Sequence, residues 1–349
     1  MSINLQRAVI AGCAIVAVAC LAPVAGHAAA PDAKVQKVVS RGLDWLAKKQ
    51  SNRGHWEAGE GRYPTSMTAL AGTALCLEGS TTTQGKYQEQ IKKAVDYLID
   101  HSRKNGLIGD PTVDDRYTYG HGFSMLFLSQ VLGEEQDKER REELVKVLTK
   151  AVEFSGRAQT DEGGWGYVSA KDGNGFDEGS TTITQVQGLR GCRNAGIPVP
   201  KEIIDKAIKY IHKCTMDDGG VQYSSKGGGG RPAISAAAIA CLFNAGDYDD
   251  KFVPKMLSYA EKNLANISNQ SFGHWHYAHY YYSQVMYREG GKKWSDYRDK
   301  IYPRICAEAT DDGRSGMYWT QGYVGPVYTT ATNLTILQLE NNTLPIYQR

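Results

Sequence analysis

Two segments of the sequence concentrate side chains that could transfer protons or bind a ligand. Residues 114–121 read Asp-Asp-Arg-Tyr-Thr-Tyr-Gly-His, and residues 274–282 read His-Trp-His-Tyr-Ala-His-Tyr-Tyr-Tyr. Histidine can exchange protons near neutral pH, and carboxylates can act as acids, bases or cation ligands. The candidate ligand-binding residues in these segments are Asp114, Asp115, His121, His276, His279 and Tyr280.

The same residue types also occur as packed, hydrogen-bonded side chains, and the sequence leaves both interpretations open. His276 and His279 are three residues apart and can share one helix face. No Asp, Glu or Cys nearby completes a set of metal ligands with them. We therefore expect no metal and no cofactor, and we assign no catalytic residue.

Acidic pairs precede turn glycines three times, at residues 161–162, 217–218 and 311–312. Their recurrence at equivalent places favours turn chemistry, in which Asp caps the turn and Gly adopts a positive φ. The alternative is a ring of carboxylates that binds cations or acts as acid and base.

The elements that must position these residues form a repeat. A basic residue, a small residue, two variable residues and an aromatic recur about every 50 residues, with a looser fifth copy and a degenerate copy near Ile301. The five aromatic residues are Trp45, Tyr97, Phe154, Tyr210 and Tyr259. Each phrase opens an amphipathic helix, and a glycine-rich turn and a second, apolar helix follow it. The sequence therefore predicts about six helical hairpins.

The second helices decide how the hairpins assemble. Residues 69–75 and 236–240 are apolar nearly all round, which is typical of a helix buried on every side. The first helices carry charge on one face. We therefore predict an all-α protein, an α/α toroid whose inner barrel of helices is wrapped by an outer barrel. Its inner helices run parallel, so residues 114–121 and 274–282 should meet at one mouth, where helix dipoles favour anionic ligands.

Two copies of the repeat carry a longer pattern that resembles a known family. Both end in Gln-x-x-x-Gly-x-Trp, at residues 50–56 and 159–165. This pattern resembles the QW repeat of squalene–hopene cyclases, which protein prenyltransferase β subunits share in weaker form. The resemblance implies an α/α toroid with its cavity at one end of the inner barrel, and residues 294–349 resemble exported bacterial members of this superfamily. It also implies structural roles for Gln50, Trp56, Gln159 and Trp165.

The catalytic motifs of that family are not found at their expected places. The cyclases protonate an alkene with an Asp-x-Asp-Asp cluster, and residues 247–250 match it in letters only. They follow the end of an inner helix, which is the opposite end from the family's acid. Prenyltransferases hold zinc with an Asp-x-Cys where an inner helix begins, and residues 231–236 contain neither Asp nor Cys. Whether the protein is an enzyme is therefore left open.

Composition and the N-terminal residues restrict the partners and the location. The 40 Lys and Arg nearly balance the 38 Asp and Glu, which argues against a nucleic-acid-binding protein. Residues 1–28 combine Arg7, an uncharged apolar stretch and small residues before a cleavage site, a pattern that predicts a signal peptide. We expect residues 29–349 to form a single toroid domain without a membrane span. The protein would be periplasmic or secreted, with lipoprotein attachment at Cys20 as the alternative.

Two classes of function fit these features. The first is an exported toroid protein that binds a ligand or partner at the inner-helix mouth without the catalysis of its family. The second is an enzyme that acts on an isoprenoid, as a cyclase does, or on a polysaccharide, as a lyase or hydrolase does. A tyrosine-lined cavity suits either a hydrophobic isoprenoid or a glycan.

Overall fold

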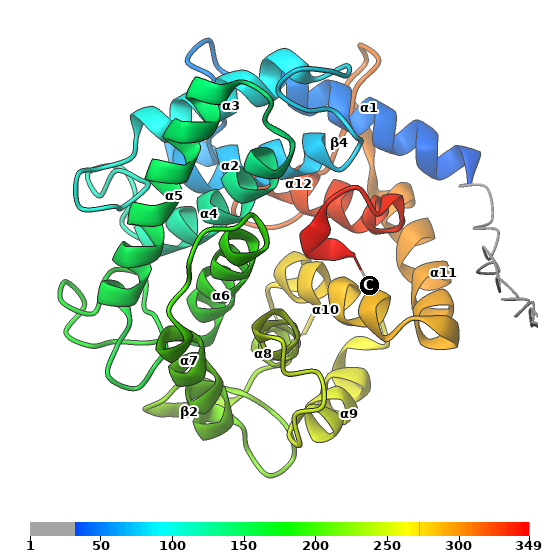
Figure 1. The fold of residues 1–349 in the computed structure, drawn as a ribbon. Coiled ribbons are helices and arrows are strands. Elements are labelled where there is room, and N and C mark those ends of the chain that lie inside the picture. The colour runs from blue at the N-terminus through cyan, green and yellow to red at the C-terminus, as the bar shows by residue number, and fades with distance from the viewer. Residues whose placement is uncertain (1–31, 272, 349) are drawn as a thin grey trace, which may run out of the picture. The chain divides into compact units, whose positions relative to one another are not determined.

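Helices dominate the computed structural model, which describes residues 32–271 and 273–348. Outer and inner helices alternate along this part of the chain and form six hairpins (Figure 1). The outer helices are α1 (Ala33–Lys49), α3 (Gln88–Asp100), α5 (Lys138–Ala158), α7 (Lys201–Cys214), α9 (Val253–Leu264) and α11 (Gly291–Glu308). The inner helices are α2 (Pro64–Cys76), α4 (Tyr117–Glu134), α6 (Gly179–Asn194), α8 (Pro232–Ala245), α10 (Trp275–Glu289) and α12 (Pro326–Leu337). The predicted signal peptide, residues 1–28, lies outside the described residues.

The inner helices form a closed ring. Each packs on the next in the order α2, α4, α6, α8, α10 and α12, and α12 packs back on α2. Every residue of α2 is buried, whereas α7 buries only the stripe that contains Ile203, Ala207 and Tyr210. The predicted all-α class and the α/α toroid are therefore confirmed, and the contrast in burial follows the contrast in hydrophobic pattern.

Two short antiparallel ladders, which the sequence pattern did not predict, lie in the turns of the hairpins. One pairs β1 (Gln222–Ser224) with β2 (Gly227–Gly230), and the other pairs β3 (Thr310–Asp311) with β4 (Met317–Tyr318). Both are too short to show alternation in the sequence.

Tryptophans tie the turn of a hairpin to both of its helices. The indole N–H of Trp56 donates to the carbonyl of Leu46 at 2.8 Å, and its backbone N–H donates to Thr68 Oγ1 at 3.1 Å. Trp165 repeats this arrangement with Ser155 and Thr182 at the same distances. A buried indole N–H needs an acceptor, so each tryptophan holds its turn in one position.

Glutamines connect successive hairpins. The Gln50 amide donates to the carbonyl of Gly54 in its own turn and to that of Gln90 in the next outer helix, both at 2.8 Å. Gln159 makes the equivalent pair of bonds at 2.9 Å. Gly54 has φ of 89° and lies so close to α3 that a Cβ atom would come within 2.4 Å of the Lys93 carbonyl oxygen. The repeat thus requires glycine at the point where one hairpin meets the next.

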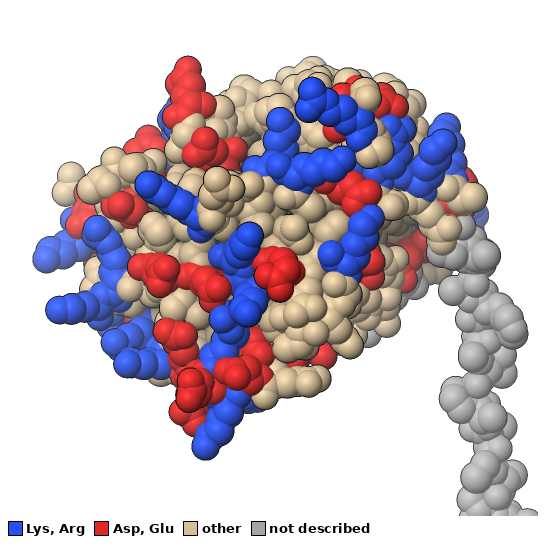
Figure 2. Space-filling view, turned by 90° about the horizontal axis from the view of Figure 1, so that it is seen from above, with Lys and Arg blue, Asp and Glu red and all other residues tan. Residues whose placement is uncertain are grey.

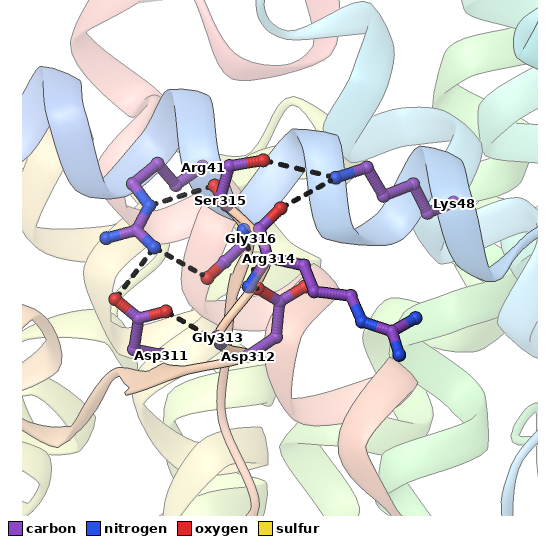
Figure 3. Close-up of polar contacts among 8 residues, drawn as sticks. All are labelled: Arg41, Lys48, Asp311, Asp312, Gly313, Arg314, Ser315 and Gly316. Atoms are coloured by element: carbon purple, nitrogen blue, oxygen red, sulfur yellow. Dashed lines mark hydrogen bonds and ion pairs between the residues drawn. The ribbon is translucent and has the colours of Figure 1, made fainter.

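The first and last hairpins meet in a polar joint (Figure 3). Arg41 on α1 donates to a carboxylate oxygen of Asp311 at 2.8 Å and to the carbonyl of Ser315 at 2.9 Å. Beside them Trp45 stacks on Tyr318 with ring centroids 5.0 Å apart and planes 5° apart. The joint closes the outer barrel where the two ends of the toroid meet.

The C-terminal segment covers the ring at the ends where the inner helices finish. Its 3₁₀ helix η3 (Pro345–Tyr347) packs against α6, and the backbone N–H of Ile346 donates to Gln130 on α4 at 3.3 Å. The hydroxyls of Tyr347 and Tyr280 on α10 are hydrogen-bonded at 2.9 Å. Figure 1 shows this segment in red near the centre of the ring. The other end, where the inner helices begin, is open.

The outer wall carries mixed charge. In the view of Figure 2, basic and acidic side chains are interspersed over the surface without a broad patch of one sign. This distribution agrees with the near balance of charges in the sequence. No helix in the described part of the chain is long and apolar enough to cross a membrane.

Candidate functional site

A cavity opens at the N-terminal ends of the inner helices. Its volume is about 370 Å³, and residues from α2, α4, α6, α8, α10 and α12 or the segments just before them line it. Because every hairpin repeats the same outer-to-inner order, these six N-termini share one end of the ring. The lining residues from the described part of the chain include seven tyrosines: Tyr63, Tyr119, Tyr167, Tyr223, Tyr277, Tyr323 and Tyr328.

The residues just before the inner helices supply much of the rim. Four of them line the cavity, and each directly precedes its helix: Tyr63 before α2, Arg116 before α4, Arg231 before α8 and His274 before α10. Tyr63 and His274 have positive φ angles, of 53° and 50°. Residues other than glycine seldom adopt this conformation, which is enriched at functional sites.

The deeper wall is apolar, with hydroxyl groups set into it. Met67, Leu70 and Phe123 from α2 and α4 are all buried side chains that line the cavity. The Tyr277 hydroxyl donates to the carbonyl of Ser180 at 3.1 Å. Burial raises the pKa of Tyr277 well above its ordinary value, so this hydroxyl stays protonated. The cavity is therefore neutral and largely apolar at depth, with its polar groups held by the protein.

The rim carries two arginines on tyrosine faces. The guanidinium of Arg116 lies 4.3 Å from the ring centroid of Tyr167, and that of Arg231 lies 4.7 Å from the ring centroid of Tyr223. The two tyrosine hydroxyls are hydrogen-bonded to each other. The rim thus offers cationic donors where the deeper wall offers none.

Of the histidines singled out in the sequence, His276 lines the cavity. Its Nδ1 atom has no hydrogen-bond partner within the described residues, and burial lowers its pKa to about 4. His279, one turn further along α10, turns toward the outer helix α11, where its Nδ1 is 2.8 Å from the Tyr297 hydroxyl. Burial lowers the pKa of His279 to about 3. Both imidazoles are therefore neutral at pH 7.

His121, on α4, contacts the turn before α4 and the outer helix α5, outside the cavity lining. The backbone N–H of Ile108 donates to its Nδ1 at 3.1 Å, and its Nε2 lies 3.2 Å from the carbonyl of Ala151. Nδ1 must accept, so Nε2 carries the proton and donates. Burial lowers the pKa of this neutral imidazole to about 4.

The two predicted carboxylates have different surroundings. Asp114 is fully buried, and one of its oxygens accepts from the backbone N–H of Arg116 at 3.3 Å. Its other oxygen has no hydrogen-bond partner among the residues that the structure describes, and burial raises its pKa to about 6. Asp115 is exposed and lies beside Tyr63. Burial is the main cause that raises the pKa of Tyr63, and the charge of Asp115 raises it further.

The structure thus places His276 in the cavity and Asp115 beside its rim. Asp114, His121, His279 and Tyr280 do not line it. Tyr280 lies at the covered end of the ring, against Tyr347. The described residues contain no group of three or more His, Cys, Asp or Glu side chains that could hold a metal ion.

Sequence reasoning did not single out the two arginines or most of the tyrosines of the rim. A signal for them was present, because Arg116 and Arg231 directly precede two inner helices. The inference that the inner N-termini meet at one mouth pointed to those positions. The predicted candidates instead include Asp114 and Asp115 before α4, and four residues inside α4 and α10.

Comparison with solved structures places the fold among helical toroids of differing activity. A type II terpene cyclase, an MstE variant from Scytonema in complex with geranylgeranyl dihydroxybenzoate, aligns at 13% identity over 89% of this chain and 98% of its own, with a TM-score of 0.58. An α-1,6-mannanase variant from Salegentibacter sp. HEL1_6, in complex with α-1,6-mannotetrose, aligns at 10% identity over 88% and 99%, with a TM-score of 0.62. The unsaturated glucuronyl hydrolase of Bacillus sp. GL1 aligns at 13% identity over 87% and 96%, with a TM-score of 0.59.

Sequence comparison adds no closer relationship. No protein-family model matches the chain, and no curated protein matches it. At such low identity the structural likeness concerns the fold alone. The chain is therefore an α/α toroid, of the architecture shared by these terpene cyclase and glycoside hydrolase structures.

Proposed function

We propose that the protein binds an isoprenoid-type amphiphile in the cavity at the inner-helix mouth and does not transform it. The observation that carries this proposal is the gradient along the cavity, from buried Met67, Leu70 and Phe123 to Arg116 and Arg231 at the rim. An apolar chain gains free energy from burial against the deeper wall. A polar head group would remain at the rim, close to water and to the cationic side chains.

The surroundings of the acidic residues at the cavity favour binding of a ligand without catalysis. Glu308 is the acidic residue of the described lining, and its carboxylate accepts from the Arg304 guanidinium at 3.0 Å. The Arg304 ion pair thus engages this carboxylate within the protein. Glu178 lies behind the wall, where it caps α6 through the backbone N–H groups of Ser180 and Thr181.

Export and membership of the squalene-cyclase repeat class form part of this proposal. The pattern of residues 1–28 supports translocation to the periplasm or the medium. The equivalent bonds of Gln50 and Gln159, and of Trp56 and Trp165, support a repeat of that class. A protein with these properties would carry or sequester its ligand outside the cytoplasm.

A glycan is the second candidate, because the rim presents aromatic faces to solvent. Tyr323 is 78% exposed, and its hydroxyl lies 3.0 Å from Nδ1 of His274. Tyrosine rings at a wide mouth can stack on sugars. The apolar depth of the cavity makes this the less favoured ligand, and direct binding measurements separate the two.

The test is calorimetric titration of the purified protein with geranylgeraniol and, separately, with neutral and acidic oligosaccharides. We expect geranylgeraniol to bind and the Leu70→Gln variant to bind it at least tenfold more weakly. Val145→Gln is the matched control, because Val145 is 39% exposed on the outer helix α5. Binding of oligosaccharides without geranylgeraniol would replace the proposal by the glycan candidate. A product detected by mass spectrometry after incubation would show an enzyme.

A further inference from the structure

Arg116 and Arg231 occupy corresponding places in the toroid. Each directly precedes an inner helix, α4 or α8, and these two helices flank α6 in the ring. Their tyrosine partners correspond as well, since Tyr167 and Tyr223 lie in the turns before α6 and α8. The two arginines and two tyrosines therefore form a continuous strip across the mouth, joined in the middle by the hydrogen bond between the tyrosine hydroxyls.

The backbone and a phenylalanine hold this strip in place. The N–H of Thr118 donates to the carbonyl of Tyr167 at 3.2 Å, and the N–H of Arg231 donates to the carbonyl of Val221 at 3.0 Å. The ring of Phe176 packs near both tyrosines, with centroid distances of 5.7 Å to Tyr167 and 6.3 Å to Tyr223. Stacking on a ring restricts the guanidinium planes before any ligand arrives.

Neither arginine of the strip is neutralised by an ion pair within the described residues. The charge of Asp115 helps to raise the pKa of Arg116, but the two side chains form no ion pair. Asp115 lies beside Tyr63 instead. Glu308 is paired with Arg304, and Glu178 is occupied in capping α6. The cavity therefore opens past two guanidinium groups whose donors are available to a ligand.

The charges of both arginines reach His274. Burial and then the charges of Arg231 and Arg116 lower the pKa of His274. His274 and both arginines line the same cavity. An anion placed at the mouth beside His274 would thus be within electrostatic reach of both guanidinium groups.

We propose that Arg116 and Arg231 together bind a carboxylate on the ligand, whose apolar body lies in the deeper cavity. A guanidinium presents paired N–H donors that match the two oxygens of a carboxylate. The N-termini of α4 and α8 add partial positive charge at the same end of the ring. The ligand would then be an isoprenoid acid rather than an alcohol. The assignment of a carboxylate head group depends on the two arginines. Only the isoprenoid nature of the ligand's apolar body rests on the proposed function.

The test compares geranylgeranoic acid with geranylgeraniol in calorimetric titrations at low salt. We expect the acid to bind the native protein at least tenfold more tightly than the alcohol. Arg116→Gln and Arg231→Gln should each reduce this preference, and the double variant should abolish it. Arg193→Gln, which removes an exposed arginine near the C-terminal end of α6, should leave it unchanged. Equal binding of acid and alcohol by the native protein, or a preference that survives in the double variant, overturns the proposal.

A carboxylate without an isoprenoid chain separates this proposal from the proposed function. Benzoate should raise the melting temperature of the native protein and have no such effect on the double variant. If benzoate does so and neither isoprenoid binds, the binding of the head group stands and the isoprenoid function fails. If benzoate affects the native protein and the double variant equally, or affects neither, the carboxylate site is refuted.

Discussion

At the scale of single residues, burial decides what the ionisable side chains can do. Burial favours the neutral form of four ionisable side chains. It raises the pKa of Asp114 and lowers the pKa values of His121, His276 and His279. Two groups that carry charge at neutral pH, Arg116 and Arg231, lie at the rim instead. The mouth therefore holds fixed cations, while the buried groups set how folding depends on pH.

Asp114→Asn should stabilise the protein at neutral pH. The folded pKa of about 6 lies above the usual value of about 3.9, so the fold favours the protonated form. Stability from this group is complete below about pH 4 and is lost as the pH rises through 6. Chemical denaturation should show a gain of about 3 kcal/mol at pH 7.5 that disappears at pH 4. Asp217→Asn, at an exposed position in the turn before β1, is the control, and an equal gain at both pH values would contradict the prediction.

Acidification should destabilise the protein through the buried histidines. The folded pKa of His121 is about 4, below the usual value of about 6.5. Its contribution is complete above pH 6.5 and is lost as the pH falls toward 4, by about 3 kcal/mol. His121→Gln should therefore flatten the decline of unfolding free energy between pH 6.5 and 4.5. A decline as steep in the variant as in the native protein would show that His121 is not the cause.

At the scale of elements, three tryptophans each make the same pair of hydrogen bonds within their own hairpins. Trp319 in the last hairpin donates its indole N–H to the Ile305 carbonyl at 2.8 Å and its backbone N–H to Thr330 Oγ1 at 3.1 Å, as Trp56 and Trp165 do in theirs. The acceptor precedes Trp319 by 14 residues, but precedes the other two by 10. The sixth copy of the repeat therefore has four more residues between acceptor and tryptophan than the other two. Because of this different spacing, only the structure reveals that Trp319 belongs to the same motif.

Trp165→Ala should lower the unfolding free energy by about 3 kcal/mol or more, as expected for truncation of a fully buried aromatic side chain. The substitution also leaves the carbonyl of Ser155 without its donor. Ligand affinity at a temperature where the variant remains folded should be unchanged, because Trp165 does not line the cavity. Unchanged thermal stability combined with lost ligand binding would instead assign Trp165 to the site.

The sequence predicted the hairpins and the toroid because the repeat and the helix burial are local patterns. It says less about the side chains of the candidate site, because the direction of a side chain depends on where its helix begins. Helix α10 begins at Trp275, so His279 and Tyr280 lie inside it and face α11 and the C-terminal segment. The same residue types before the helix would have faced the mouth, as His274 does.

At the scale of the whole molecule, closure changes how the repeats share stability. In an open stack each repeat contacts only its neighbours, and stability is a sum of local terms. Here α12 packs on α2, and the Gln338 side chain donates to the carbonyl of Ala74 at 3.0 Å. The last hairpin is therefore as much a neighbour of the first as of the fifth. Loss of the joint removes contacts from both ends of the chain at once.

Weakening the joint should consequently destabilise the opposite side of the ring. Tyr318→Ala removes the ring that stacks on Trp45 between the first and last hairpins. If the ring unfolds as one cooperative unit, the most protected amides of α6 should exchange with solvent faster by the same factor as those of α1 and α12. Hydrogen-exchange mass spectrometry measures all three helices in one experiment, with Val145→Gln on the outer wall as the control. Faster exchange confined to α1, α11 and α12 would mean that the repeats behave as an open stack and that the joint is only a surface contact.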